Sequence, residues 1–121
     1  YGNGLQTRDW LFVDDHVEAL YKVIKKGTLG ETYNIGGNNQ KTNLEVVNHI
    51  CELLDGKINL PAHGLSSHKN LIEFVNDRLG HDERYAMNIT KISNELDWLP
   101  STSFNTGIDK TVNWYIDNYE Y

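Results

Sequence analysis

Apolar residues at helical spacing are the feature that most constrains the fold of this 121-residue chain. The clearest example begins at Thr42 and Glu45, whose separation is typical of a capping box, in which each side chain bonds the backbone N–H of the other residue. The apolar positions that follow recur every three or four residues, at Val46, Val47, Ile50, Leu53 and Leu54. We therefore expect a helix that starts near residue 42, buries this face and ends at Gly56.

Three other segments also predict helices. Asp15 and Glu18 have the same capping-box spacing, and the helix that they open would end within residues 27–30. Its apolar positions are Val17, Leu20, Tyr21 and Ile24. A third helix is expected within residues 88–100, and the last one begins near Ser103.

Strands are expected to be short and few. Residues 31–35 and 72–75 carry the apolar and β-branched side chains typical of strands, and the apolar run at 10–13 predicts a strand or an extended entry into a helix. Proline, glycine and serine predict a loop over residues 57–70. These runs do not make a full doubly wound sheet. We expect a helix-rich α/β unit, with about four helices and a few short strands, that contributes an edge to a larger body.

Composition excludes several classes of function. The net charge of −6 argues against a nucleic-acid binder, which needs a basic face. The one cysteine, Cys51, lies in an apolar helical pattern, so we expect a buried thiol in a reducing, cytoplasmic setting. No stretch is long and apolar enough to cross a bilayer, so no membrane partner is expected. The polar start at Tyr1, without an initiator methionine, predicts a piece of a longer protein.

One stretch concentrates groups that bind anions. Within residues 75–85, Arg78 and His81 lie three apart, and Gly80 lets the backbone approach a ligand. Guanidinium and imidazole N–H groups donate to phosphate oxygens. Alternatively, Arg78 and Arg84 pair with the acidic side chains beside them on a solvated loop. From these residues alone ion pairs are favoured by roughly two to one, since structural ion pairs are commoner than sites.

Two other positions add donors for an anion. Arg8 follows the glycine-spaced start, where its alternative is an ion pair with Asp9. Asn43 belongs to the first turn of the second predicted helix, where free backbone N–H groups attract phosphate. Arg8, Asn43, Arg78 and His81 could therefore converge on one anionic group.

The chain carries no pattern for a metal or a nicotinamide cofactor. Gly2 and Gly4 follow no strand and lack the third glycine of a dinucleotide fingerprint. The five histidines have no metal-binding spacing, and two of them, His63 and His68, are expected to be solvated in the loop. We expect no catalytic, cofactor-binding or metal-binding residue in this chain.

Three motifs give nearly the whole chain a family resemblance. They are YGNGLQTRDWLFVDDH at 1–16, ETYNIGG at 31–37 and DRLGHDERY at 77–85. With them the chain resembles the C-terminal part of the dTDP-glucose 4,6-dehydratases, within the extended short-chain dehydrogenase/reductase family. Many sugar-nucleotide epimerases and decarboxylases share the first two motifs in looser form, whereas the third is specific to the dehydratases. Leu79 departs from the proline usual at that position, which leaves the loop less rigid.

The resemblance implies a binding site for a dTDP-sugar substrate. It implies that Arg8 and Asn43 contact the diphosphate and that Tyr1 ends a segment packed along the nucleotide. It places four residues at the nucleotide end of the substrate: Asp77, Arg78, Gly80 and His81.

The resemblance also implies a larger parent enzyme. That parent is a lyase that uses bound NAD to convert dTDP-glucose to dTDP-4-keto-6-deoxyglucose, in nucleotide-sugar metabolism such as rhamnose biosynthesis. NAD and the catalytic groups would belong to a Rossmann part upstream, so residues 1–121 would form the C-terminal sugar-nucleotide-binding domain and be inactive alone. The parent would be a homodimer, and the chain alone a monomer or weakly self-associating through bare apolar surface.

Two alternative functions stay open. The first is a stand-alone nucleotide-sugar binding module that kept the fold and lost the chemistry. The second is a part of another extended family member, such as an epimerase or decarboxylase, which the Arg78–His81 motif disfavours. The preference between thymine and uracil also stays open, since the residues that read the base would lie partly upstream.

Overall fold

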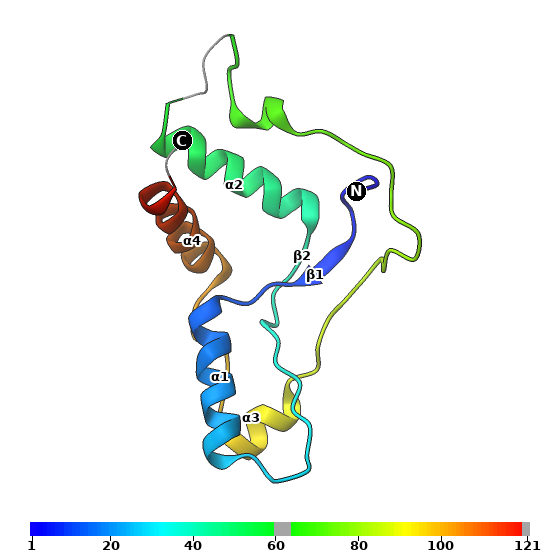
Figure 1. The fold of residues 1–121 in the computed structure, drawn as a ribbon, viewed down its shortest axis with the longest axis vertical. Coiled ribbons are helices and arrows are strands. Elements are labelled where there is room, and N and C mark those ends of the chain that lie inside the picture. Colours follow the sequence, from blue (N-terminus) through cyan, green and yellow to red (C-terminus); the bar gives the residue numbers. More distant parts are fainter. Residues whose placement is uncertain (60–63, 120–121) are drawn as a thin grey trace.

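A computed structural model describes residues 1–59 and 64–119 of the chain. Its elements are, in order, β1 (Thr7–Asp9), α1 (Val13–Lys26), β2 (Gln40–Thr42), α2 (Asn43–Lys57), the 3-10 helix η1 (His68–Leu71), α3 (Thr90–Leu96) and α4 (Phe104–Asn118). The molecule is elongated, with α2 and α4 at one end, α1 and α3 at the other, and the two strands between them (Figure 1). The prediction of a helix-rich α/β unit with about four helices and a few short strands is confirmed.

The two strands form an antiparallel pair in which Arg8 faces Lys41. Asp9 ties the approach to β2 onto β1, because its carboxylate accepts hydrogen bonds from the backbone N–H groups of Gly37 at 3.1 Å and Asn39 at 2.8 Å. A β-carbon at residue 37 would overlap a backbone carbonyl oxygen of the segment after β1. Glycine is therefore required there by close approach of two backbones.

A compact core joins α1 to α3. Its fully or nearly fully buried members are Ala19, Ile92, Leu96 and Trp98. Tyr33 and Ile35 pack against them from the segment between α1 and β2. This cluster holds the lower end of the molecule in Figure 1 together.

Asp15 is a buried carboxylate inside α1. It accepts hydrogen bonds from Ser101 Oγ at 2.8 Å, from the Thr102 backbone N–H at 2.9 Å and from Thr102 Oγ1 at 3.2 Å. Burial alone would raise the pKa of Asp15, but these hydrogen bonds outweigh burial and hold the pKa below its ordinary value. The capping box predicted at Asp15 is wrong: α1 begins at Val13 after Phe12, and the carboxylate binds residues far along the chain instead.

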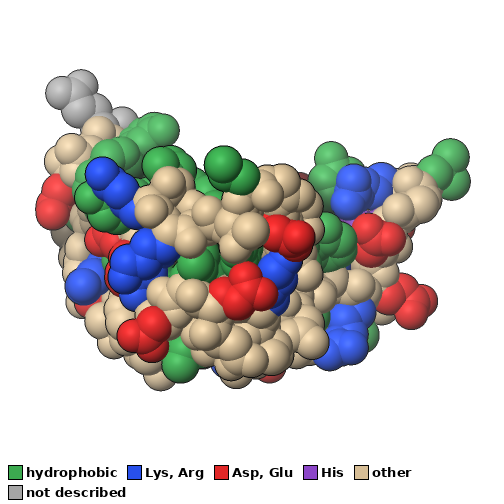
Figure 2. Space-filling view, turned by 90° about the horizontal axis from the view of Figure 1, so that it is seen from below, with side chains coloured by type: hydrophobic (Ala, Val, Ile, Leu, Met, Phe, Trp, Pro, Cys, Tyr) green, Lys and Arg blue, Asp and Glu red, His purple; other side chains and the backbone are tan. Residues whose placement is uncertain are grey.

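The residues predicted as the apolar face of α1 lie at the surface. Their exposed fractions run from 45% to 81%, for Val17, Leu20, Tyr21 and Ile24. The buried side of α1 carries Asp15 and Ala19 instead. Seen from the end where α1 and α3 lie, hydrophobic side chains stand at the surface among charged ones (Figure 2). The helical period is as predicted, but the described contacts cover a different side of the helix.

Local capping signals place α2 and α4. The capping box at Thr42 is confirmed: the Glu45 backbone N–H donates to Thr42 Oγ1 at 3.1 Å, and the Thr42 N–H donates to Glu45 Oε2 at 2.7 Å. The predicted start of the last helix near Ser103 is confirmed, and in the structure the Ser103 side chain caps α4. Helix α2 continues through Gly56 and ends at Lys57, so the predicted stop is one residue early.

Of the segments predicted as strands, 31–35 and 72–75 form no strand in the described residues, whereas the extended entry into a helix predicted as the alternative for residues 10–13 is confirmed, since α1 begins at Val13 after an extended Phe12. Tyr33 and Ile35 pack against the core with no described strand beside them, and Phe74 and Val75 are exposed. Of the loop predicted over residues 57–70, positions 60–63 lie outside the described residues. The end of that loop forms η1.

Candidate functional site

Three segments meet beside β1. The Gly2 backbone N–H donates to the Val75 carbonyl oxygen at 2.9 Å. Thr7 exchanges two backbone hydrogen bonds with the incoming segment, to the Glu83 oxygen at 2.8 Å and from the Tyr85 N–H at 3.0 Å. The stretch 75–85 is therefore bound along its length to the N-terminal segment, which the sequence alone does not show.

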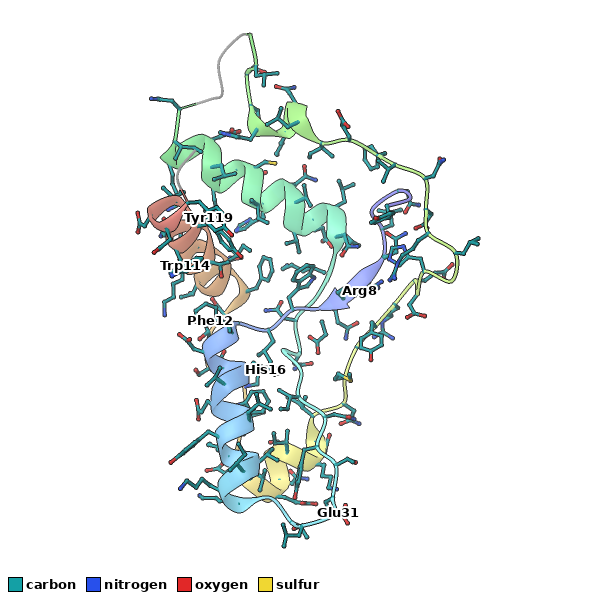
Figure 3. The ribbon with its side chains drawn as sticks, in the orientation of Figure 1. Arg8, Phe12, His16, Glu31, Trp114 and Tyr119 are labelled. Carbon is teal, nitrogen blue, oxygen red and sulfur yellow. The ribbon has the colours of Figure 1, made fainter. Side chains whose placement is uncertain are left out.

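The start of α2 reaches the same segment. The Asn43 backbone N–H donates to the Gln6 carbonyl oxygen at 3.0 Å, and the Leu44 N–H donates to the Gly4 oxygen at 2.9 Å. Arg8 projects from β1 close by (Figure 3), and its Nη1 donates to the Thr7 carbonyl oxygen at 2.8 Å. The backbone thus gathers the three parts of the chain from which the predicted anion ligands come.

Asp77 is the centre of the hydrogen bonding in the 75–85 stretch. Its Oδ1 accepts from His81 Nδ1 at 2.7 Å and from the Arg78 backbone N–H at 2.9 Å, and its Oδ2 accepts from Gln6 Nε2 at 3.3 Å. The bond from His81, with the one from Arg78, holds the pKa of Asp77 below its ordinary value. Gly80 has a φ of +68°, a left-handed conformation that turns the chain so that His81 returns to Asp77.

His81 lines a cavity of about 570 Å³ with Gln6, Asp77 and Arg84. Only 7% of its side chain is exposed.

The alternative prediction, that Arg78 and Arg84 pair with neighbouring acidic side chains, is not what the structure has. Arg84 donates through Nε and Nη2 to Gln40 Oε1, at 3.0 and 2.6 Å, and within the described residues the Arg78 guanidinium makes no ion pair or hydrogen bond.

Gln6 is a residue of this region that the sequence analysis does not single out. It is 8% exposed, and its Oε1 has no hydrogen-bond partner among the described residues. A buried polar atom left unpaired costs about 1–3 kcal/mol. A lone glutamine in a polar start carries no sequence signal, because its partner Asp77 lies 71 residues away.

Tyr1 and Asn43 line a second cavity, of about 380 Å³, with Cys51 and His68. Four of the seven predicted ligand-binding residues therefore line these two cavities, Asp77 and His81 in one and Tyr1 and Asn43 in the other, and Arg8, Arg78 and Gly80 line neither of these two. Cys51 is buried as predicted, and burial, with the nearby Asp55 carboxylate, raises the pKa of its thiol. This thiol is a packing group rather than a nucleophile.

His68 is buried, so the prediction that it is solvated is wrong. Asp55 on α2 accepts hydrogen bonds from Ser67 Oγ at 2.6 Å, from the His68 backbone N–H at 2.7 Å and from His68 Nδ1. Those bonds, led by the one from Ser67, lower the pKa of Asp55 to about 2. These bonds of Asp55 to Ser67 and His68, called the Asp55 clasp below, fix η1 to α2. His63, the other histidine of the predicted loop, lies outside the described residues.

Two patterns that hold metals or dinucleotides can be compared with the described residues. Residues 1–59 and 64–119 contain no group of three or more His, Cys, Asp or Glu side chains placed to hold a metal ion. Gly2 and Gly4 precede β1 rather than follow a strand, so they do not form a dinucleotide-binding turn. Among the described helices, none is long and apolar enough to cross a membrane.

Comparisons with known proteins agree with the motifs. A sequence model described as GDP-mannose 4,6 dehydratase matches residues 1–111. The dTDP-glucose 4,6-dehydratase of Neisseria gonorrhoeae is 55% identical over 118 residues, which are 98% of this chain and 34% of that protein. An Escherichia coli protein of the same name is 51% identical over 121 residues, all of this chain and 33% of the protein.

Solved structures show the same relationship. A dTDP-glucose 4,6-dehydratase from Bacillus anthracis, in complex with NAD, has 51% identity and a TM-score of 0.81, over 98% of this chain and 34% of that one. A Thermotoga maritima UDP-glucose 4-epimerase, with UDP-glucose, has 26% identity and a TM-score of 0.78, over 99% of this chain and 35% of that one. The resemblance to the extended short-chain dehydrogenase/reductase enzymes is thus confirmed, and the chain spans about a third of the length of the relatives it matches. With a family model that covers residues 1–111, the chain belongs to the GDP-mannose 4,6 dehydratase family.

Proposed function

We propose that this chain is the sugar-nucleotide-binding domain of a dTDP-glucose 4,6-dehydratase, a lyase that works with bound NAD on a dTDP-sugar. The supporting observation is the identity of 55% and 51% with enzymes of that name over almost the whole chain. The His81 side chain, which is 7% exposed and bonded to Asp77 at the wall of the 570 Å³ cavity, supports it independently. One reduced, buried cysteine fits a cytoplasmic enzyme, and the product would serve a pathway such as rhamnose biosynthesis.

The role proposed for these residues is to bind and orient the substrate. Arg8 and the N-terminus of α2 at Asn43 would bind the diphosphate, because guanidinium groups and free backbone N–H groups both donate to phosphate oxygens. Arg78, Gly80 and His81 would bind the nucleotide end. Tyr1 would pack along the nucleotide through its exposed ring.

NAD, when bound elsewhere in the enzyme, supplies hydride acceptance from sugar C4 and hydride return to C6. The residues described here would hold the sugar nucleotide still during that exchange, since correct placement of reactants lowers the barrier to reaction. We expect no turnover of dTDP-glucose by this chain alone, and formation of a 4-keto-6-deoxy sugar by the purified polypeptide would contradict this. The complete enzyme is proposed to be a homodimer, with the chain alone monomeric or weakly self-associating.

Arg78→Ala tests the site in a complete enzyme that contains this chain. If the guanidinium binds a phosphate away from water, the variant should lose about 2–5 kcal/mol of transition-state binding, read from kcat/KM for dTDP-glucose. Lys26→Ala is the matched control, because it removes an exposed cation at the end of α1. Equal kcat/KM values for the two variants would remove Arg78 from the site.

An epimerase is the second candidate function, because the Thermotoga maritima UDP-glucose 4-epimerase shares this fold with a TM-score of 0.78. Calorimetric titration of a complete enzyme that contains this chain, with dTDP-glucose, UDP-glucose and GDP-mannose, distinguishes the two candidate functions. Tightest binding of dTDP-glucose supports the proposal. A preference for UDP-glucose or GDP-mannose would refute it.

A further inference from the structure

Gln6, Asp77 and His81 form one hydrogen-bonded series along the wall of the 570 Å³ cavity. Gln6 Nε2 lies 3.3 Å from Asp77 Oδ2, and Asp77 Oδ1 lies 2.7 Å from His81 Nδ1. We propose that Gln6 and Asp77 are positioning residues, which hold His81 in one tautomer so that its Nε2 is presented to the nucleotide as a hydrogen-bond acceptor. This inference rests on the proposed function for the identity of the ligand.

The Asp77 carboxylate determines which nitrogen of His81 and which group of the Gln6 amide carry the hydrogen atoms that face it. An ionised carboxylate only accepts hydrogen bonds, so the His81 nitrogen that meets Asp77 must be Nδ1–H. The other ring nitrogen, Nε2, then remains for a ligand, because the bond made by one nitrogen decides the state of the other. Gln6 must likewise present its NH₂ group to Asp77, since a reversed amide would place two acceptors against each other.

The groups that face this imidazole suit the part of a nucleotide that donates hydrogen bonds, because two of them are carboxylates. Asp77 occupies one side of His81, while Glu83 and Arg84 contribute to the rest of the cavity wall. The Arg84 guanidinium is held by Gln40, which leaves it fixed at the edge of the same cavity. A ligand in this space meets one fixed cation and one oriented imidazole nitrogen.

A purely structural role would be to attach residues 77–81 to the N-terminal segment. That attachment already exists without the side chains, through the backbone bonds of Gly2 to Val75 and of Thr7 to residues 83 and 85. The Gln6 amide also stays in the orientation that serves Asp77 although its Oε1 is left without a partner in the described residues. Such an arrangement favours function over stability as the reason for the side-chain series.

Imidazole ¹⁵N chemical shifts of the labelled chain report the tautomer directly. In the wild type, His81 should carry its proton on Nδ1. Asp77→Asn should shift it toward the Nε2–H form, because the new amide can donate to Nδ1. Gln6→Met should weaken the Nδ1–H preference, and Gln40→Met, the same substitution at the other glutamine, should leave it unchanged.

Calorimetry with dTDP as the probe tests the consequence for binding. Gln6→Met should weaken dTDP binding about tenfold, as loss of an outer partner of a ligand-binding histidine does at metal sites. In the His81→Gln background the same change should have no further effect, since Gln6 acts through His81. Additive losses in the two variants would overturn the proposal.

The outcomes separate this inference from the function on which it rests. Wild-type binding of dTDP, with an Nε2–H tautomer or with no effect of Gln6→Met, refutes the positioning role and leaves the proposed function standing. No binding of dTDP by the wild type, in the chain or in a complete enzyme that contains it, refutes both the nucleotide ligand and the proposed function. Unfolding of Gln6→Met in urea, compared with Gln40→Met, shows whether a loss of binding is only a loss of fold.

Discussion

Removal of the Asp15 carboxylate is expected to destabilise the end of the molecule where α1 meets α3. Asp15 is 4% exposed and accepts its three hydrogen bonds from Ser101 and Thr102. A hydrogen bond to a charged group contributes about 1.5–3 kcal/mol, and bonds that share one carboxylate are not additive. We expect Asp15→Ala to lower the free energy of unfolding by about 3 kcal/mol, out of the roughly 5–15 kcal/mol typical of a domain.

Urea unfolding followed by tryptophan fluorescence measures this loss, because Trp98 is 1% exposed in the same core. The midpoint should fall while the dependence of free energy on urea is unchanged. Asp14→Ala is the control, since Asp14 is the exposed acidic neighbour of Asp15. The lowered pKa of Asp15 makes its contribution present above the ordinary pKa and lost as pH falls through the folded-state value, so the difference from the wild type should narrow in acid. Equal unfolding free energies for the two variants at neutral pH would refute the reasoning.

Three further predictions concern packing, association and the Asp55 clasp. Gly37→Ala should lower the free energy of unfolding by about 1–3 kcal/mol, because the new β-carbon overlaps backbone atoms. Gly56→Ala, with open space around residue 56, should stabilise α2 by about 0.5–1 kcal/mol. Urea midpoints that shift in the same direction in both variants would contradict this. Ile24→Lys on the bare face of α1 should reduce weak self-association in sedimentation velocity, and Leu29→Lys, 98% exposed off that helix, should not; a tight dimer independent of concentration would count against it. Asp55→Ala should speed proteolysis near η1 at neutral pH, because it removes the clasp, and cleavage at the wild-type rate would exclude the clasp. In the wild type, whose Asp55 pKa is lowered to about 2, protection of η1 from proteolysis should persist until the pH falls below about 4.

The features that sequence predicts correctly are those set by neighbouring residues. The capping box of Thr42 and the start of the last helix near Ser103 depend on hydrogen bonds between residues three positions apart. The environment of Asp15 depends on Ser101, 86 residues along the chain, so a correct capping-box spacing predicted the wrong role. For the same reason the periodicity of α1 was visible, whereas the side that the rest of the chain covers was not.

In the candidate site, too, local sequence predicts some features, whereas others depend on contacts between residues far apart in the chain. The motif at 77–85 predicts His81 and Arg78 as ligands through its resemblance to the dehydratases, and these roles stay predictions. The partners that orient them were not predictable, since Gln6 joins Asp77 only through the fold. Gln6 and Asp77 meet because backbone hydrogen bonds attach the 75–85 stretch to Gly2 and Thr7.

The two cavities explain why the chain alone should bind a nucleotide weakly. Residues of the N-terminal segment line both cavities: Tyr1 and Gly4 line one, and Asn3, Leu5 and Gln6 line the other. A ligand that touches both must lie across this segment, where water screens the charges that attract it. Relatives of which this chain spans about a third have further chain available to cover such a ligand. Fixed hydrogen-bonding groups gain strength when water is excluded, so affinity for dTDP should rise steeply in a complete enzyme.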